Sequence, residues 1–173
     1  QYPQVTVKDS FGYSLMKERI RVLTTPNGAD ARDYYAALGN NDADLSVAQT
    51  YGRAIALVRG GDAAAAIPQL EKLRSAYPEV MAFHTALGQA QLAAGDTRHA
   101  LETFERAHAL APRNIPVTVR YGEALLQAGR PKRAHEVLLD LFNNVPPTPE
   151  QVRLTAKAAN AAGDVADAYS YMA

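Results

Sequence analysis

The 173-residue chain is long enough to bury a substantial apolar core, as one domain or as one short array of repeats. Its 18 basic and 18 acidic side chains balance, which argues against nucleic acid or an anionic membrane as the partner. The sequence contains no cysteine, which excludes disulfide bonds and thiolate metal sites.

The first 46 residues lack a regular pattern. We expect residues 1–8 to be extended and residues 10–23 to form a helix, with Phe11, Leu15, Ile20 and Val22 facing a core. The run 24–28 breaks this helix, and residues 30–38 predict a short second helix that ends at Gly39. We interpret residues 1–46 as an extended segment followed by a helical cap or a degenerate repeat.

The rest of the chain has a 34-residue period. The recurring residues are Gly61, Gly95, Gly129 and Gly163, then Ala66, Ala100, Ala134 and Ala168, and finally Pro78, Pro112 and Pro146. A fixed period of this length predicts a solenoid, in which each unit buries its apolar face against its neighbours. The pattern predicts complete repeats over 47–80, 81–114 and 115–148 and an incomplete one over 149–173, so we expect the chain to be a fragment of a longer protein.

Each repeat is expected to be a pair of antiparallel helices. In the second repeat, Gly95 can end the first helix by adopting a left-handed conformation. Asp96 follows as the N-cap of the second helix, and Pro112 ends that helix because it cannot continue it. The small residues Gly88 and Ala100 allow the two helices to approach where they cross.

This second repeat resembles the tetratricopeptide repeat. The resemblance lies in Leu87-Gly88 on the first helix, in Ala100 and Phe104 on the second, and in the closing Pro112. The usual tryptophan and tyrosine are replaced by His84 and Gln91. The resemblance implies an all-α, right-handed superhelical solenoid of antiparallel helix pairs (TPR), a class of fold that serves protein–protein interaction.

In such repeats the first helix of each pair lines a concave groove, and the resemblance therefore implies a set of binding residues. They are Tyr51, Ile55, Arg59, Thr85, Gln89, Arg120, Glu123, Gln127, Arg153 and Lys157. Alternatively, Tyr51, Ile55 and Val58 pack on the N-terminal helices. The Lys/Asn clamp that holds chaperone C-termini has no match here, although Arg120, Arg153 and Lys157 leave another anion site open.

Catalytic chemistry is not expected in this segment. The four histidines lack metal-ligand spacing, and His135-Glu136 begins an HExxH motif that fails at Leu139. No nucleophile elbow or phosphate-binding loop is present. We therefore expect no catalytic residue, metal site or cofactor here.

A further resemblance covers residues 7–23 (VKDSFGYSLMKERIRVL) and 48–54 (AQTYGRA). These stretches are similar to the segment that follows the protease domain in periplasmic BepA-type HExxH zinc metalloproteases, whose C-terminal region consists of tetratricopeptide repeats. The resemblance implies a periplasmic location and a zinc-binding protease domain in the parent protein. Its partners would be outer-membrane protein substrates, their assembly complex and the protein's own protease domain.

Two other functions are compatible with the sequence. The first is a tetratricopeptide adaptor or scaffold with no associated protease, and the second, weaker one is a lipoprotein pilot for secretion or pilus assembly. No apolar run reaches the roughly 18 residues that a membrane-spanning helix needs. No signal peptide is visible in the sequence.

Overall fold

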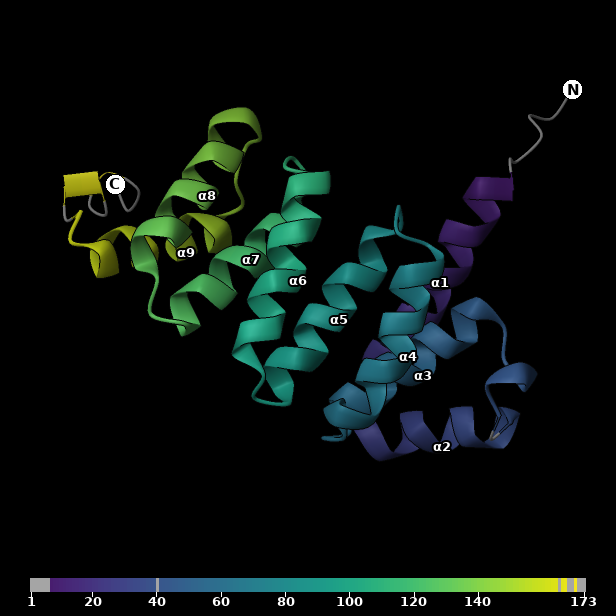
Figure 1. The fold of residues 1–173 in the computed structure, drawn as a ribbon. Coiled ribbons are helices and arrows are strands. Elements are labelled where there is room, and N and C mark those ends of the chain that lie inside the picture. Colours follow the sequence, from purple (N-terminus) through teal and green to yellow (C-terminus); the bar gives the residue numbers. More distant parts are fainter. Residues whose placement is uncertain (1–6, 40, 165, 168–169, 171–173) are drawn as a thin grey trace, which may run out of the picture. The chain divides into compact units, whose positions relative to one another are not determined.

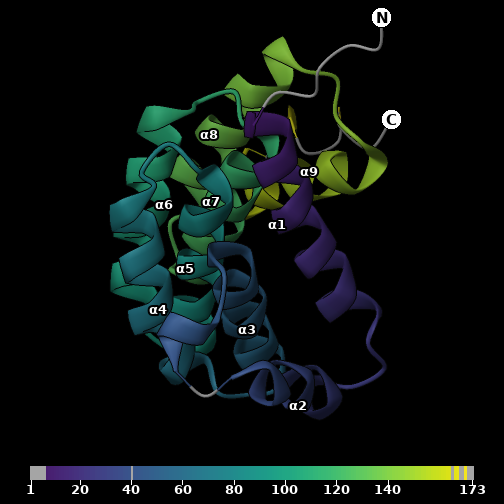
Figure 2. The same cartoon turned by 90° about the vertical axis from the view of Figure 1, so that its right-hand side faces the viewer.

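The computed structural model describes residues 7–39, 41–164, 166–167 and 170. In this part of the chain the regular structure is nine α-helices and one short 3-10 helix, with no β-strand, which confirms the predicted all-α fold (Figures 1 and 2). The chain divides into two compact units, Gln1–Ala94 and Gly95–Ala173, and each is described by itself. None of the helices in the described part is long and apolar enough to cross a bilayer.

The first unit contains five α-helices, with α3 at its centre. They are α1 (Val7–Thr24), α2 (Gly28–Leu38), α3 (Val47–Arg59), α4 (Ala63–Ala76) and α5 (Met81–Ala93), and the 3-10 helix η1 (Asp42–Asp44) precedes α3. Helices α1, α2, α4 and α5 all contact α3. Val7 and Lys8 are helical, so the predicted extended segment is wrong at these two positions, and its first six residues lie outside the described part.

The second unit contains four α-helices that pack in sequence. They are α6 (Thr97–Leu110), α7 (Ile115–Gln127), α8 (Pro131–Asn144) and α9 (Pro149–Ala162). Helix α7 packs against α6 and α8, α8 packs against α9, and α7 and α9 also touch each other. This contact between α7 and α9 places the first helices of two successive predicted repeats side by side.

The 34-residue period is visible in the backbone. Helices α3, α5, α7 and α9 begin at Val47, Met81, Ile115 and Pro149, so their starts follow one another at this period. The four glycines that end them have φ between +69° and +87°, a left-handed conformation that residues with a β-carbon resist. The predicted left-handed turns are therefore confirmed, whereas the limits of the individual repeats stay a prediction.

The predicted N-cap at Asp96 is confirmed, and the equivalent position of the preceding repeat differs. The Asp96 carboxylate accepts a hydrogen bond from the backbone N–H of His99 at 3.2 Å, as expected of an N-cap. The His99 ring contacts the same carboxylate at 2.5 Å, and these two hydrogen bonds lower the pKa of Asp96. Asp62, at the equivalent position before α4, makes no such side-chain cap.

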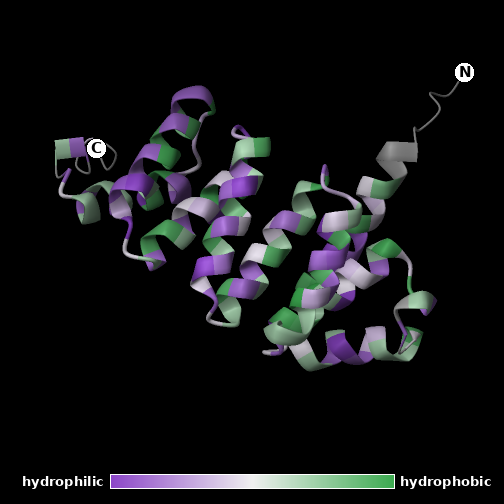
Figure 3. Cartoon of the chain, viewed as in Figure 1, coloured by the Kyte–Doolittle hydropathy of each residue, from purple (hydrophilic) through white to green (hydrophobic). Residues whose placement is uncertain are grey.

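Apolar and polar residues alternate within the helices of both units (Figure 3). In the first unit, the core is made of alanines and larger side chains from α1, α3, α4 and α5, among them Leu15, Tyr51, Leu70 and Phe83. In the second unit, the fully buried residues include Phe104, Val117 and Leu138. The crossing of α7 and α8 is close, because a β-carbon on Gly122 would lie 2.9 Å from the Leu138 side chain.

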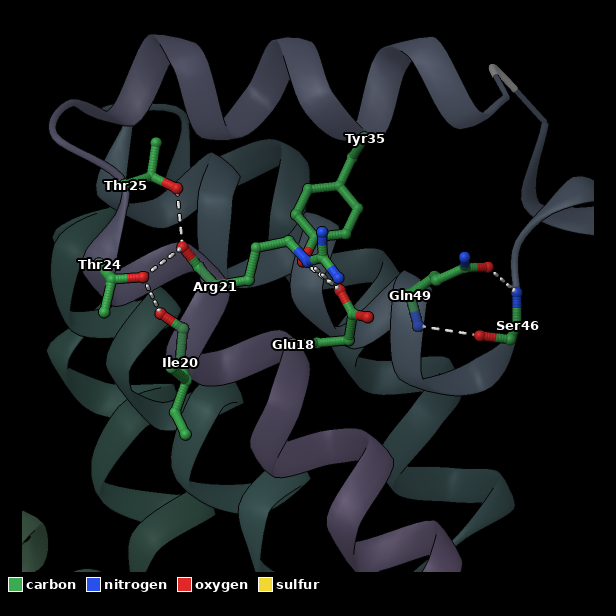
Figure 4. A network of polar contacts seen from close by, with 8 residues as sticks. All are labelled: Glu18, Ile20, Arg21, Thr24, Thr25, Tyr35, Ser46 and Gln49. Carbon is green, nitrogen blue, oxygen red and sulfur yellow. Dashed lines mark hydrogen bonds and ion pairs between the residues drawn. The ribbon is translucent and has the colours of Figure 1, made fainter.

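A buried polar contact joins α1 to α2 (Figure 4). The Tyr35 hydroxyl donates a hydrogen bond to the Glu18 carboxylate at 2.6 Å, and Arg21 lies 3.4 Å from the same carboxylate. Burial, followed by the hydrogen bond to Glu18, raises the pKa of Tyr35 far above its ordinary value. Arg21 also stacks over the Tyr34 ring at 4.3 Å, so this network fixes the two N-terminal helices to each other.

One predicted core residue of α1 faces outward. Leu15 and Val22 are buried and Phe11 is partly buried, but Ile20 is 52% exposed. Figure 4 shows its side chain directed away from Glu18 and Tyr35. Residues 11, 15, 18 and 22 share one helical face, and Ile20 lies on the opposite side.

Candidate functional site

A groove of about 580 Å³ opens between α7 and α9 of the second unit. Its lining consists of Arg120, Glu123, Leu126 and Gln127 from α7 and of Leu154, Lys157 and Ala161 from α9. Three positions recur at the 34-residue period, since Arg120, Glu123 and Gln127 correspond to Leu154, Lys157 and Ala161. The short steps between them, one helical turn each, place each set along one face of its helix. The groove is thus a direct product of the repeat.

Two of the three charged side chains in this groove pair with each other, and the third, Lys157, does not share in this pair. Arg120 donates a hydrogen bond to the Glu123 carboxylate at 2.8 Å, in an ion pair that is partly exposed to solvent. Such pairs contribute about 0–1 kcal/mol to stability and can exchange partners at low cost. Lys157 is exposed and forms no ion pair within the described part of the chain. Among the described residues, the groove therefore presents this lysine as an uncompensated cation next to the apolar side chains of Leu126 and Leu154.

Four of the ten predicted binding residues come together in this groove, namely Arg120, Glu123, Gln127 and Lys157. Arg153 is exposed on α9 but does not line the groove. Leu154 is not among the predicted residues, although its equivalence to Arg120 in the next repeat could have revealed it. A binding role for any of these residues stays a prediction.

The predicted residues of the first unit are less accessible. Tyr51 is 2% exposed and packs against Phe83, with ring centroids 5.5 Å apart, in the cluster that also contains Leu15. Burial raises the pKa of its hydroxyl, and Arg19 lies beside it. Ile55 and Val58 pack against the same cluster. The prediction that Tyr51 lines an open groove is therefore wrong, because α1 covers this face of α3. Tyr51 instead packs on the N-terminal helices, as in the alternative given above.

The three other predicted residues of this unit differ in exposure. Thr85 is buried, and its hydroxyl donates a hydrogen bond to the Met81 carbonyl at 3.0 Å. Gln89 is half-buried. Arg59 is exposed, and its guanidinium donates a hydrogen bond to the Val22 carbonyl of α1. Arg59 thus helps to hold α1 in place.

The histidines occupy separate local environments. His84 contacts the Pro78 carbonyl oxygen at 2.8 Å, and His135 contacts Asp164 at 3.2 Å. His108 packs on the Tyr121 ring, and burial followed by the charge of Arg133 lowers its pKa. Among the residues that the structure describes, no three histidine, aspartate or glutamate side chains are grouped so that they could hold a metal ion.

Comparison with known proteins relates this geometry to a family. Two family models, both described as tetratricopeptide repeat, match residues 51–115 and 91–158. None of the curated proteins matches the chain.

Solved structures share the fold at low sequence identity. TTC0263, a thermophilic TPR protein of Thermus thermophilus, is 18% identical with a TM-score of 0.70, over 92% of this chain and 87% of its own. MamA of MSR-1 is 19% identical with a TM-score of 0.67, over 92% and 88%. A Podospora anserina protein with nearly identical TPR-like repeats is 15% identical with a TM-score of 0.70, over 98% and 94%. The chain is therefore built from tetratricopeptide repeats over residues 51–158.

Proposed function

We propose that this chain is a protein-binding module that holds an extended segment of a partner in the groove between α7 and α9. Tetratricopeptide repeats indicate protein–protein interaction and are typically non-catalytic, which agrees with the expectation that this segment is not an enzyme. The observation on which the proposal rests is the alignment of equivalent positions from two successive repeats along one groove.

The lining of the groove indicates the chemistry of the bound segment. Leu126 and Leu154 offer apolar surface to a side chain that leaves water on binding. Lys157 can pair with a carboxylate of the bound segment. Arg120 can provide a second cation if it leaves Glu123 and pairs with a carboxylate of the segment instead. A segment that alternates apolar and acidic side chains satisfies both requirements.

This preference can be measured with two fluorescent peptides, one of alternating leucine and aspartate and one of alternating leucine and asparagine. We expect the aspartate peptide to bind about fivefold more tightly, because a partly exposed charge pair contributes up to about 1 kcal/mol. Lys157→Glu is expected to abolish this preference in fluorescence anisotropy titrations. Equal affinities of the wild-type chain for both peptides would contradict the proposal.

Lys132→Glu is the matched control for this experiment. Lys132 is an exposed lysine on α8 that does not line the groove, and its replacement changes the net charge by the same amount. If both variants lost the preference for the aspartate peptide to the same extent, the cause would be the net charge of the chain. Lys157 would then not be a binding residue of the groove.

We further propose that the parent protein is a periplasmic zinc metalloprotease of the BepA type, in which this module docks outer-membrane proteins or their assembly complex. Support comes from the similarity of residues 7–23 and 48–54 to that family and from the repeats that follow them. Any zinc would belong to the protease domain of the parent. The alternative is an adaptor with no associated protease.

The parent protein can be captured with an antibody against this segment and analysed for intact mass and bound metal. We expect one zinc ion per chain and a mass well above that of this segment, because the protease domain precedes the repeats in that family. A zinc-free chain that is little longer than the repeats would support the adaptor instead. Cross-linking of the captured protein to an outer-membrane protein tests the proposed partners separately.

A further inference from the structure

Helix α1 is apolar on two opposite faces. Its inner face packs against α3 through Phe11, Leu15 and Val22. Its outer face exposes four large apolar side chains, Tyr13, Met16, Ile20 and Leu23, with exposed fractions of 70%, 55%, 52% and 55%. These are four of the seven large apolar side chains that are exposed in the described part of the chain. Single exposed apolar residues are ordinary, whereas four on one helix indicate an interaction surface.

The outer residues form a continuous stripe. Their alternating steps of three and four positions are the spacing by which one helix packs along another. We call Tyr13, Met16, Ile20 and Leu23 the outer stripe. Gly12 lies at its edge, and a β-carbon there would meet no atom within 4 Å, so the backbone is open to close approach.

Both sides of the outer stripe carry positive charge. At about 100° per residue, Lys17 and Arg19 lie about 80° to either side of the centre of the stripe. Both are exposed. The acidic residue between them, Glu18, is buried and accepts the hydrogen bond of Tyr35. Over residues 11–24 the outer face therefore combines an apolar centre with two cationic borders and no acidic counterpart.

We infer that the outer stripe binds an amphipathic helix of a partner protein whose own apolar stripe is bordered by acidic side chains. Charge complementarity selects this occupant, because carboxylates on both borders would meet Lys17 and Arg19. A second copy of the chain fits less well, since pairing two outer stripes over residues 11–24 places cation against cation in either orientation. The outer stripe shares no residue with the groove between α7 and α9, and the inference does not rest on that proposed site.

A lipid surface fits less well than a helix. Helices that lie on membranes bury a wide apolar face and keep a charged face in water. The inner face of α1 is packed against α3, so only the narrow outer stripe is available.

The test uses the full 173-residue chain and two synthetic amphipathic peptides with identical apolar heptad positions. One peptide has glutamate and the other lysine at every position that borders the apolar stripe. We expect the glutamate peptide to bind at least about tenfold more tightly, because two border pairs change from repulsive to attractive. Lys17→Glu is expected to reduce this preference, and Leu23→Ser is expected to remove binding of both peptides.

Leu110→Ser provides the matched control, because Leu110 is 63% exposed and lies on α6, outside the outer stripe. This variant should bind the glutamate peptide as the wild type does, and circular dichroism should show unchanged helicity in both serine variants. Equal binding of the two peptides, or undiminished binding by Leu23→Ser, would overturn the inference.

Two further outcomes would assign the outer stripe to another occupant and would also overturn it. The first is a dimer of the chain alone in analytical ultracentrifugation that Leu23→Ser dissociates. The second is co-sedimentation with phosphatidylglycerol vesicles that Leu23→Ser abolishes. We expect a monomer and no vesicle binding.

Discussion

Replacing Gly52 with alanine is expected to lower the free energy of unfolding by about 3 kcal/mol, from overpacking and from the weakening of a buried hydrogen bond. A β-carbon at this position of α3 would lie 2.2 Å from the Tyr35 hydroxyl oxygen and 3.0 Å from the β-carbon of Glu18. Tyr35 cannot withdraw freely, because it is completely buried and its hydroxyl is bonded to Glu18. Urea denaturation followed by circular dichroism measures the change.

Gly12→Ala is the control for this substitution. Gly12 also lies inside a helix, but its β-carbon would meet no atom within 4 Å, so the better helix propensity of alanine should raise the free energy of unfolding by about 0.5–1 kcal/mol. The two variants thus differ in sign for the same chemical change. Equal effects would show that the contact of Gly52 with Tyr35 and Glu18 is not a determinant of stability.

The repeating part of the fold was predictable because each of its signals is local. A left-handed glycine is needed where each first helix ends, and a small residue is needed where two helices cross. These requirements return with the 34-residue period, so the glycines and alanines fix helix order and spacing before any long-range contact is considered. The same periodicity relates Arg120 to Leu154 and Glu123 to Lys157, and it places these four residues in one groove.

The N-terminal helices were harder to predict, because their positions depend on contacts that no period encodes. The sequence does not reveal that Tyr35 of α2 reaches Glu18 of α1 or that Gly52 provides the space for this contact. It also does not distinguish the two apolar faces of α1, which is why the sequence pattern assigns Ile20 to the core. Once α1 covers α3, the face of α3 that would line a groove becomes part of the core.

Replacing Tyr51 with alanine tests whether this residue packs in the core or binds a partner. We expect Tyr51→Ala to lower the free energy of unfolding by about 3–4 kcal/mol. The Tyr51 ring is 2% exposed and lies among Leu15, Leu70 and Phe83, so its removal leaves a cavity in the core of the first unit. A residue that only contacted a partner in an open groove would leave the stability of the free chain almost unchanged.

Tyr13→Ala is the matched control, because Tyr13 is 70% exposed on the outer stripe and its removal creates no cavity. We expect its effect on the free energy of unfolding to be within about 0.5 kcal/mol. The two variants should therefore behave in opposite ways, Tyr51→Ala losing stability and Tyr13→Ala losing only affinity for the acidic amphipathic peptide. If Tyr51→Ala were as stable as Tyr13→Ala in urea denaturation, α1 would not cover α3 in solution, and the groove predicted from the sequence would be open at this end.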